Sequence, residues 1–170
     1  MLESLLVPTA IVALAEIGDK TQLMIGVSRH TLEPEKVFKS GTGTAYTLPG
    51  KQHATDPQIG LFHDLSPTVR LYATIAEKTR LPSLKDRYSA RLDRFIANPK
   101  LQAEEARNYE IGYQGQPWAG AQAEFAVFRN DIEDKIQSVN LKGAASCTPA
   151  NKCQMQNVGE ARIKGVELSL

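Results

Sequence analysis

The sequence has little excess charge, no long apolar run and only two cysteines. Its 170 residues carry a formal net charge of +1, so bulk charge gives no support for a nucleic-acid partner. The apolar run at residues 5–15 has 11 residues, whereas a membrane-spanning helix needs about 20. Mean hydropathy is −0.30, which excludes a bundle of membrane helices. A β-barrel is not excluded, because its strands turn alternate polar residues inward.

Signatures of catalysis are also missing. The sequence contains no P-loop, no G-x-S-x-G and no H-E-x-x-H motif. Asp131 and Asp134 form a pair of acids in "RNDIEDK", and we assign them to the solvated end of a strand. We therefore predict a protein that is not an enzyme and needs no cofactor.

The two cysteines, Cys147 and Cys153, lie close together in "CTPANKC". Turn-forming residues between them favour a small disulfide loop in an oxidising compartment. The alternative is two unrelated free thiols. A zinc site needs more ligands, and the three histidines, at positions 30, 53 and 63, are distant in sequence. We expect both cysteines in one loop, between the segments 121–139 and 154–170.

A helix is expected at the N-terminus, over residues 2–22. Its apolar residues recur at helical spacing, and Pro8 is tolerable in an early turn. The period changes at about residue 24, so we expect this helix to stay apart from the structure that follows.

The remainder shows short runs of alternating polar and apolar residues between Gly, Pro, Asn and Asp clusters, which indicates strands. The predicted strands are 23–31, 57–65, 68–78, 107–115, 121–139 and 154–170. Residues 57–78 should form an antiparallel hairpin that turns at Ser66–Pro67. One face should carry Val69, Leu71, Ala73, Ile75, Tyr109, Ile111 and Tyr113, and the other Arg70, Tyr72, Glu110 and Gln114.

Periodicity alone leaves two architectures open. Short turns that alternate with long connections are typical of an outer-membrane barrel, but a soluble β-sandwich shares the alternation. The 19-residue run at 121–139 is long for a sandwich strand and favours the barrel. The predicted fold class is therefore mainly β: an antiparallel meander that forms an incomplete transmembrane barrel, with one N-terminal α-helix.

Four stretches in order carry a family resemblance. They are "YATIAEKTRLPSLKDRYS", "NPKLQAEEARNYEIGYQG", "AEFAVFRNDIEDKIQSV" and "NVGEARIKGVELSL". Together they resemble the C-terminal barrel of TonB-dependent outer-membrane receptors, over about residues 24–170. The motifs place Gly112 and Gly165 where a strand bends or a neighbouring backbone approaches. Glu110 and Glu167 share the inward parity that suits a watery lumen.

The resemblance implies a transport receptor in the outer membrane that takes up a metal chelate such as a siderophore. Its partners would be outer-membrane lipid, the chelate and the TonB energy-coupling system, which acts through a plug domain. The plug and the beginning of the barrel are missing here, and the family barrel has about 22 strands. We therefore expect a fragment that does not transport by itself.

A second resemblance concerns residues 1–23. The stretch "AEIGDKT" resembles the E-x-G-D-K-[ST] signature of membrane exchangers for manganese, calcium and protons. Under this reading Glu16 and Asp19 would be oxygen ligands of the ion. One copy offers two carboxylates where such ions take about six oxygens, so we expect no specific binding.

Two alternatives to the receptor remain at this point. The chain is a piece of an inner-membrane cation exchanger, or it is a soluble β-rich binding module. The receptor is preferred because its motifs are more numerous and extend over residues 24–170, which gives two domains, 1–23 and 24–170.

Overall fold

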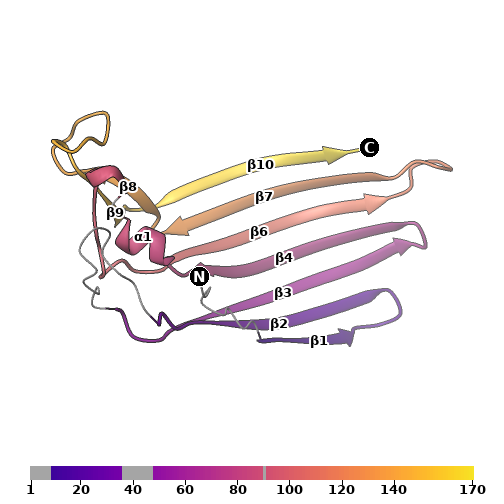
Figure 1. The fold of residues 1–170 in the computed structure, drawn as a ribbon. Helices are drawn as coiled ribbons and strands as arrows, with labels where there is room; N and C mark the ends of the chain where they lie inside the picture. The colour runs from indigo at the N-terminus through magenta and orange to yellow at the C-terminus, as the bar shows by residue number, and fades with distance from the viewer. Residues whose placement is uncertain (1–8, 36–47, 90) are drawn as a thin grey trace.

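The computed structural model describes residues 9–35, 48–89 and 91–170. Seven strands form one antiparallel sheet in the order β1-β2-β3-β4-β6-β7-β10 (Figure 1). Their bounds are β1 Thr9–Glu16, β2 Thr21–Leu32, β3 Gln52–Ser66, β4 Val69–Arg80, β6 Glu104–Gly115, β7 Ala123–Glu133 and β10 Ala161–Ser169. Within the described ranges β1 and β10 lie at opposite edges, so this meander does not close on itself. The predicted β class and the meander are confirmed.

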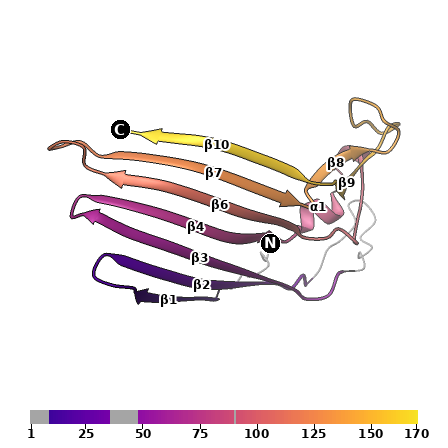
Figure 2. The same ribbon diagram turned by 180° about the vertical axis from the view of Figure 1, so that it is seen from behind.

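The two ends of the sheet differ in their connections. β1–β2, β3–β4 and β6–β7 are joined by short turns at one end, while the described parts of the longer connections gather at the other (Figures 1 and 2). The predicted hairpin is confirmed, since β3 and β4 pair antiparallel across Pro67 and Thr68. A register shift between Asp64 and Ser66 adds a bulge next to this turn.

The alternation of side chains gives the sheet two chemically different faces. Directly opposed residues of antiparallel strands point to the same side, and the register places Leu71 opposite Tyr113 and Ala73 opposite Ile111. The predicted faces are therefore confirmed. One face, here called the apolar face, exposes Ile11, Ile25, Val27, Ile59, Leu61, Leu71, Ile75, Ile111, Phe125, Val127, Val166 and Leu168. The opposite face, called the polar face, carries Tyr72, Glu110 and Glu167.

The predicted N-terminal helix is wrong for every residue of it that the structure describes. Residues 9–16 form β1 and pair with β2 from Thr9–Arg29 to Glu16–Gln22. A short apolar run reads equally as helix or strand by periodicity, and pairing satisfies the open backbone groups along β2. A turn then follows, in which Gly18 has a φ of 93°. Residues 1–8 lie outside the described part of the chain.

Two segments expected as single strands are each divided. Residues 121–139 form β7 and β8 (Ile136–Asn140), and residues 154–170 contain β9 (Cys153–Asn157) and β10. The first break lies at Asp134, whose φ of 51° is left-handed and turns the chain out of the main sheet. β8 and β9 belong instead to a second sheet, together with β5 (Phe95–Ile96), in the order β5-β9-β8.

Glycines on the polar face make room for aromatic rings. A Cβ atom on Gly112 would lie 2.3 Å from Cζ of Tyr72, and one on Gly165 would lie 2.4 Å from Cζ of Phe128. Tyr72 faces Gly112 and Phe128 faces Gly165 in the register. At both glycines the close neighbour is therefore an aromatic side chain and not a backbone.

The main sheet has few buried side chains. Both of its faces are largely exposed, and most of the buried hydrophobic residues lie at the long-connection end or near it: Leu32, Ala54, Tyr88, Leu101, Ile136 and Cys153. Among the described residues, no helix has the length and apolar character needed to cross a membrane. The folded core of this chain is therefore at one end of the sheet.

We predict that Gly112→Ala lowers the free energy of unfolding by about 1–3 kcal/mol, since the new methyl group must displace a ring. The Tyr72 hydroxyl donates a 2.7 Å hydrogen bond to Oε1 of Glu110, and ring displacement would break it. Urea unfolding of the chain measures the change. In the double variant with Tyr72→Ala, the cost of Gly112→Ala should largely disappear; strictly additive costs would contradict the ring-over-glycine contact.

Candidate functional site

The candidate site is the folded unit at the end of the sheet where the long connections meet. It comprises residues 81–89, 91–103 and 134–160, called the loop-end unit below. It contains α1 (Leu84–Tyr88), a short 3₁₀ turn (Arg91–Asp93) and the three-stranded sheet β5-β9-β8. Both ribbon views place α1, β8 and β9 together beyond the loop-side ends of β7 and β10 (Figures 1 and 2).

The helix α1 begins where the sequence provides a cap. The side chain of Ser83 accepts from the backbone N–H of Asp86, and the Asp86 carboxylate accepts from the N–H of Ser83. Asp86 also pairs with Arg80 at 2.9 Å. This reciprocal capping box satisfies two backbone donors, and the Arg80–Asp86 pair ties the helix to the end of β4.

Arg87 joins three segments that are distant in sequence. Its side chain is almost fully buried, with 1% exposed. Nη1 donates to the carbonyl oxygen of Pro99 at 2.6 Å, and Nη2 donates to Oε1 of Gln52 at 2.9 Å. Burial lowers the pKa of the Arg87 guanidinium, although arginine stays protonated in proteins. The neighbouring Tyr88 is also buried, and burial raises its pKa.

Asparagines from two of the motifs hold the connections together. Asn98 donates through Nδ2 to the carbonyl of Met155 at 2.8 Å. Asn157 accepts from the backbone N–H of Gln102 and donates to the carbonyl of Asp134. Asn98 of "NPKL" therefore binds the segment before "NVG", and Asn157 of "NVG" binds the segment after "NPKL". An asparagine amide suits both positions, because it can donate and accept hydrogen bonds.

A carboxylate connects the loop-end unit to the main sheet. Glu104, the first residue of β6, accepts from the backbone N–H of Ile136 at 2.9 Å. It also lies 3.6 Å from Arg80. The Glu104 carboxylate therefore caps the start of β8 and links it to Arg80 at the end of β4.

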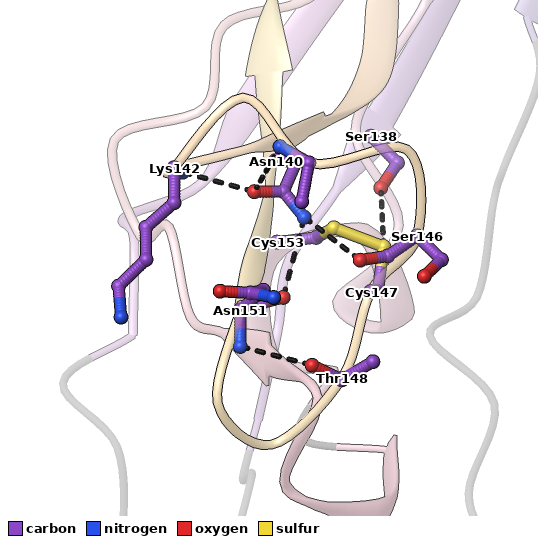
Figure 3. Close-up of a disulfide and its surroundings, with 9 residues drawn as sticks. Ser138, Asn140, Lys142, Ser146, Cys147, Thr148, Asn151 and Cys153 are labelled. Atoms are coloured by element: carbon purple, nitrogen blue, oxygen red, sulfur yellow. Dashed lines mark hydrogen bonds between the residues drawn. A yellow bond between two sulfur atoms is a disulfide. The ribbon is translucent and has the colours of Figure 1, made fainter.

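The predicted disulfide between Cys147 and Cys153 is present. Their Cα atoms are 5.5 Å apart, within the usual range for a disulfide. Cys147 lies in the β8–β9 loop, whereas Cys153 is the first residue of β9 and donates its N–H to the carbonyl of Arg94 at 2.9 Å. The bridge therefore fixes the loop to the second sheet (Figure 3).

Asn140 orders the rest of this loop. Its side-chain oxygen accepts from the N–H groups of Lys142 and Ala144, and its amide donates to the carbonyls of Ser146 and Asn151 (Figure 3). One side chain thus satisfies four backbone groups, so the 141–152 segment has a defined shape without a hydrophobic core of its own.

The polar face below this unit carries paired charges. Arg70 donates through Nε and Nη2 to the two carboxylate oxygens of Asp64, at 2.6 and 3.0 Å. Asp56 is buried, accepts from the N–H of Thr79 and lies 3.3 Å from Nε2 of His30. These contacts join adjacent strands across a face suited to water.

The structure does not bring the predicted metal residues into a site. Glu16 ends β1, and Asp19 lies in the following turn. Among the described residues, no group of three or more His, Cys, Asp or Glu side chains is placed to hold a metal ion. Asp131, suspected only as a solvated acid, accepts from Arg162 at 2.5 Å and pairs with Arg129 at 2.7 Å.

Sequence reasoning missed Arg87 and Gln52. A buried arginine has no periodic signature, because its contacts lie in other segments. The Ser83–Asp86 capping box is a readable signal for α1, but the predicted strands leave residues 79–106 without a regular element. The unit exposes Leu92, Ile96 and Leu141 on a framework held by hydrogen bonds, an arrangement that suits recognition of a ligand by contact.

We predict that Arg87→Lys lowers the free energy of unfolding of the loop-end unit by about 2 kcal/mol, because a lysine cannot supply both bonds of the guanidinium fork. Limited proteolysis under increasing urea measures the opening of this unit. The control is Arg94→Lys, an exposed arginine, for which we expect a change within about 0.5 kcal/mol. Equal effects of the two substitutions would contradict the role of Arg87.

Comparison with known proteins assigns this arrangement to a family. The family model described as TonB dependent receptor-like, beta-barrel matches residues 18–170. The heme/hemopexin utilization protein C of Haemophilus influenzae (strain 86-028NP) is 28% identical over 163 residues, covering 81% of this chain and 22% of that protein.

Two solved structures are similar in fold. The FrpB iron transporter from Neisseria meningitidis (F3-3 variant) has 25% identity and a TM-score of 0.64, with 95% of this chain and 22% of that chain covered. The siderophore receptor PirA from Pseudomonas aeruginosa has 21% identity and a TM-score of 0.67, with 95% and 27% covered. The chain spans about a fifth to a quarter of the length of these relatives.

Proposed function

The chain belongs to the TonB-dependent receptor-like β-barrel family, and we propose that it supplies part of the wall and loops of an outer-membrane receptor for a metal chelate. The observation that carries the proposal is the sheet itself. Its apolar face suits lipid, its polar face suits a watery lumen, and residues 18–170 match the family.

The proposed ligand is an iron chelate, a siderophore or heme. The relatives are described as a heme/hemopexin utilization protein, an iron transporter and a siderophore receptor. The further proposed partners are outer-membrane lipid and the TonB system, reached through a plug domain that the matched segment does not include. The role is transport rather than catalysis.

The proposed orientation follows from the two ends of the sheet. Short turns face the periplasm and long loops face outward in barrels of this kind, which supports a position of the loop-end unit outside the cell. A disulfide there suits an oxidising surface. The loop-end unit would then contact the chelate before it enters the barrel.

A chimera tests the function. In the Haemophilus influenzae relative, residues 18–170 of this chain would replace the matched segment, and growth on heme or on a ferric siderophore as the only iron source would be measured. We expect growth on one of the two. A chimera that reaches the cell surface as a heat-modifiable barrel and supports growth on neither would contradict the proposal.

The same chimera tests the lipid face. We predict that Ile111→Arg lowers the free energy of unfolding in vesicles by about 2–4 kcal/mol if Ile111 lies near the bilayer midplane. Leu71→Arg should act in the same direction. Thr74→Arg, on the polar face of β4, should cost far less, because a lumen offers water to the charge. Equal costs on the two faces would rule out the barrel assignment.

We also propose that residues 1–23 have a separate origin, in a membrane cation exchanger. Two observations support this. Residues 16–21 carry the E-x-G-D-K-[ST] signature, and β1 exposes apolar Val12 and Leu14 on the face where other strands are polar. Flanking DNA that continues the barrel upstream in the same frame, through these codons, would count against a separate origin.

A further inference from the structure

A row of charged and aromatic residues borders the apolar face on its loop side. Cross-strand pairing aligns Ile75, Tyr109, Arg129 and Lys164 in one row. The next row toward the loops is Glu77, Arg107, Asp131 and Arg162. Below them, toward the short turns, comes the apolar row Ala73, Ile111, Val127 and Val166. Along β7 and β10 this face therefore changes from apolar to charged over two residues, from Val127 to Arg129 and from Val166 to Lys164.

In the row nearer the loops, which contains Glu77, Arg107, Asp131 and Arg162, the charges are balanced within the row. Arg107 pairs with Glu77 at 3.0 Å, and Arg162 pairs with Asp131 at 2.5 Å. Each of these cations lies directly opposite the carboxylate that it binds. This alternation is the arrangement that stabilises a cross-strand row.

The row below it does not balance its charges. Arg129 and Lys164 are directly opposed, which places their Cβ atoms about 4.5–5.5 Å apart and is unfavourable for like charges. In the described ranges of the chain Lys164 has no ion-pair partner, and Arg129 shares Asp131 with Arg162. Arg129 and Lys164 carry two positive charges, and the shared carboxylate of Asp131 balances only part of this charge. The pair therefore leaves a place for an added anion.

Arg129 is held in position for such an anion. Its Nη2 lies 2.7 Å from Asp131, and its Cζ lies 5.8 Å from the ring centre of Tyr109. A cation over an aromatic face gains electrostatic energy, so the guanidinium is restrained from two sides. Tyr109, Ile111, Val127, Arg129, Lys164 and Val166 line one hollow of the surface.

We propose that Arg129 and Lys164 bind the phosphate of an anionic lipid in the outer leaflet, whose acyl chains lie on Ile111, Val127 and Val166. The inference rests on the proposed function, because it takes the apolar face as the lipid face and the loop side as the outer side. Charge complementarity identifies the headgroup, and the adjacent apolar row identifies the remainder of the ligand as hydrocarbon. A guanidinium fork and an ammonium group are both common ligands of phosphate.

The test uses the full chain added to vesicles of two compositions, phosphatidylcholine alone and phosphatidylcholine with lipid A. Flotation measures the association, and circular dichroism measures the strand content in each case. We expect association with both vesicles and stronger association when lipid A is present. A cation near an anionic surface contributes about a fivefold change in binding. R129Q and K164Q should therefore each lower the preference for lipid A vesicles about fivefold.

Lys78→Gln is the matched control, since Lys78 is exposed on β4 and belongs to the polar face. It should leave the lipid A preference unchanged. Inorganic phosphate should not compete away the preference, because it makes no contact with the apolar row; full competition would indicate a free-anion site and overturn the proposal. Equal loss in K78Q, R129Q and K164Q would also overturn it, as a general charge effect.

Failure of the underlying function has a different signature. A chain that associates with neither vesicle and gains no strand structure there would overturn the membrane placement and the lipid site together. A chain that inserts equally well into both vesicles, with no effect of R129Q or K164Q, would overturn the lipid site alone.

Discussion

Backbone hydrogen bonding between neighbouring strands is the constraint on which this structure depends. In hydrocarbon no water is present to satisfy N–H and C=O groups, so each strand must pair on both sides. Five of the seven strands, β2, β3, β4, β6 and β7, do this through antiparallel ladders. β1 pairs on one side only in the described part of the chain, as does β10. The relatives, of which this chain spans about a fifth to a quarter, contain the length needed for further strands.

A single sheet that is exposed on both faces cannot contain a hydrophobic core, and few residues of the main sheet are buried. In the proposed barrel the side chains of the main sheet face lipid or lumen, so the stability of the sheet comes from the ladder and from cross-strand contacts such as Tyr72 over Gly112. The loop-end unit must hold its shape in water instead. It does so with Arg87, Asn140 and the disulfide, because its segments are too short to bury much apolar area.

The main sheet and the loop-end unit have different parts in the proposed function. The sheet supplies the boundary between lipid and lumen, and its rows of charge at the loop side give a place for lipid headgroups. The loop-end unit supplies exposed side chains on a fixed framework. This division explains why polar residues with specific partners concentrate at one end, while the wall tolerates any apolar residue that faces lipid.

By itself the sequence determined the strands whose two faces differ chemically, together with their hairpin and the disulfide. Alternation is a local property, so residues 68–78 and 107–115 were assigned to their faces correctly before any partner was known. The family motifs were readable for the same reason. β1 was not, because the apolar run at residues 5–15 fits either a helix or a strand until a neighbour offers unpaired backbone groups.

Tertiary structure alone decided the break at Asp134, the role of Arg87 and the opposition of Arg129 and Lys164. Arg87 binds Gln52 and Pro99, which lie 35 and 12 residues away, and no local pattern encodes such a distance. Arg129 and Lys164 are likewise unremarkable in their own strands. They become neighbours only through the register of β7 and β10, and register is set by the whole ladder rather than by either strand.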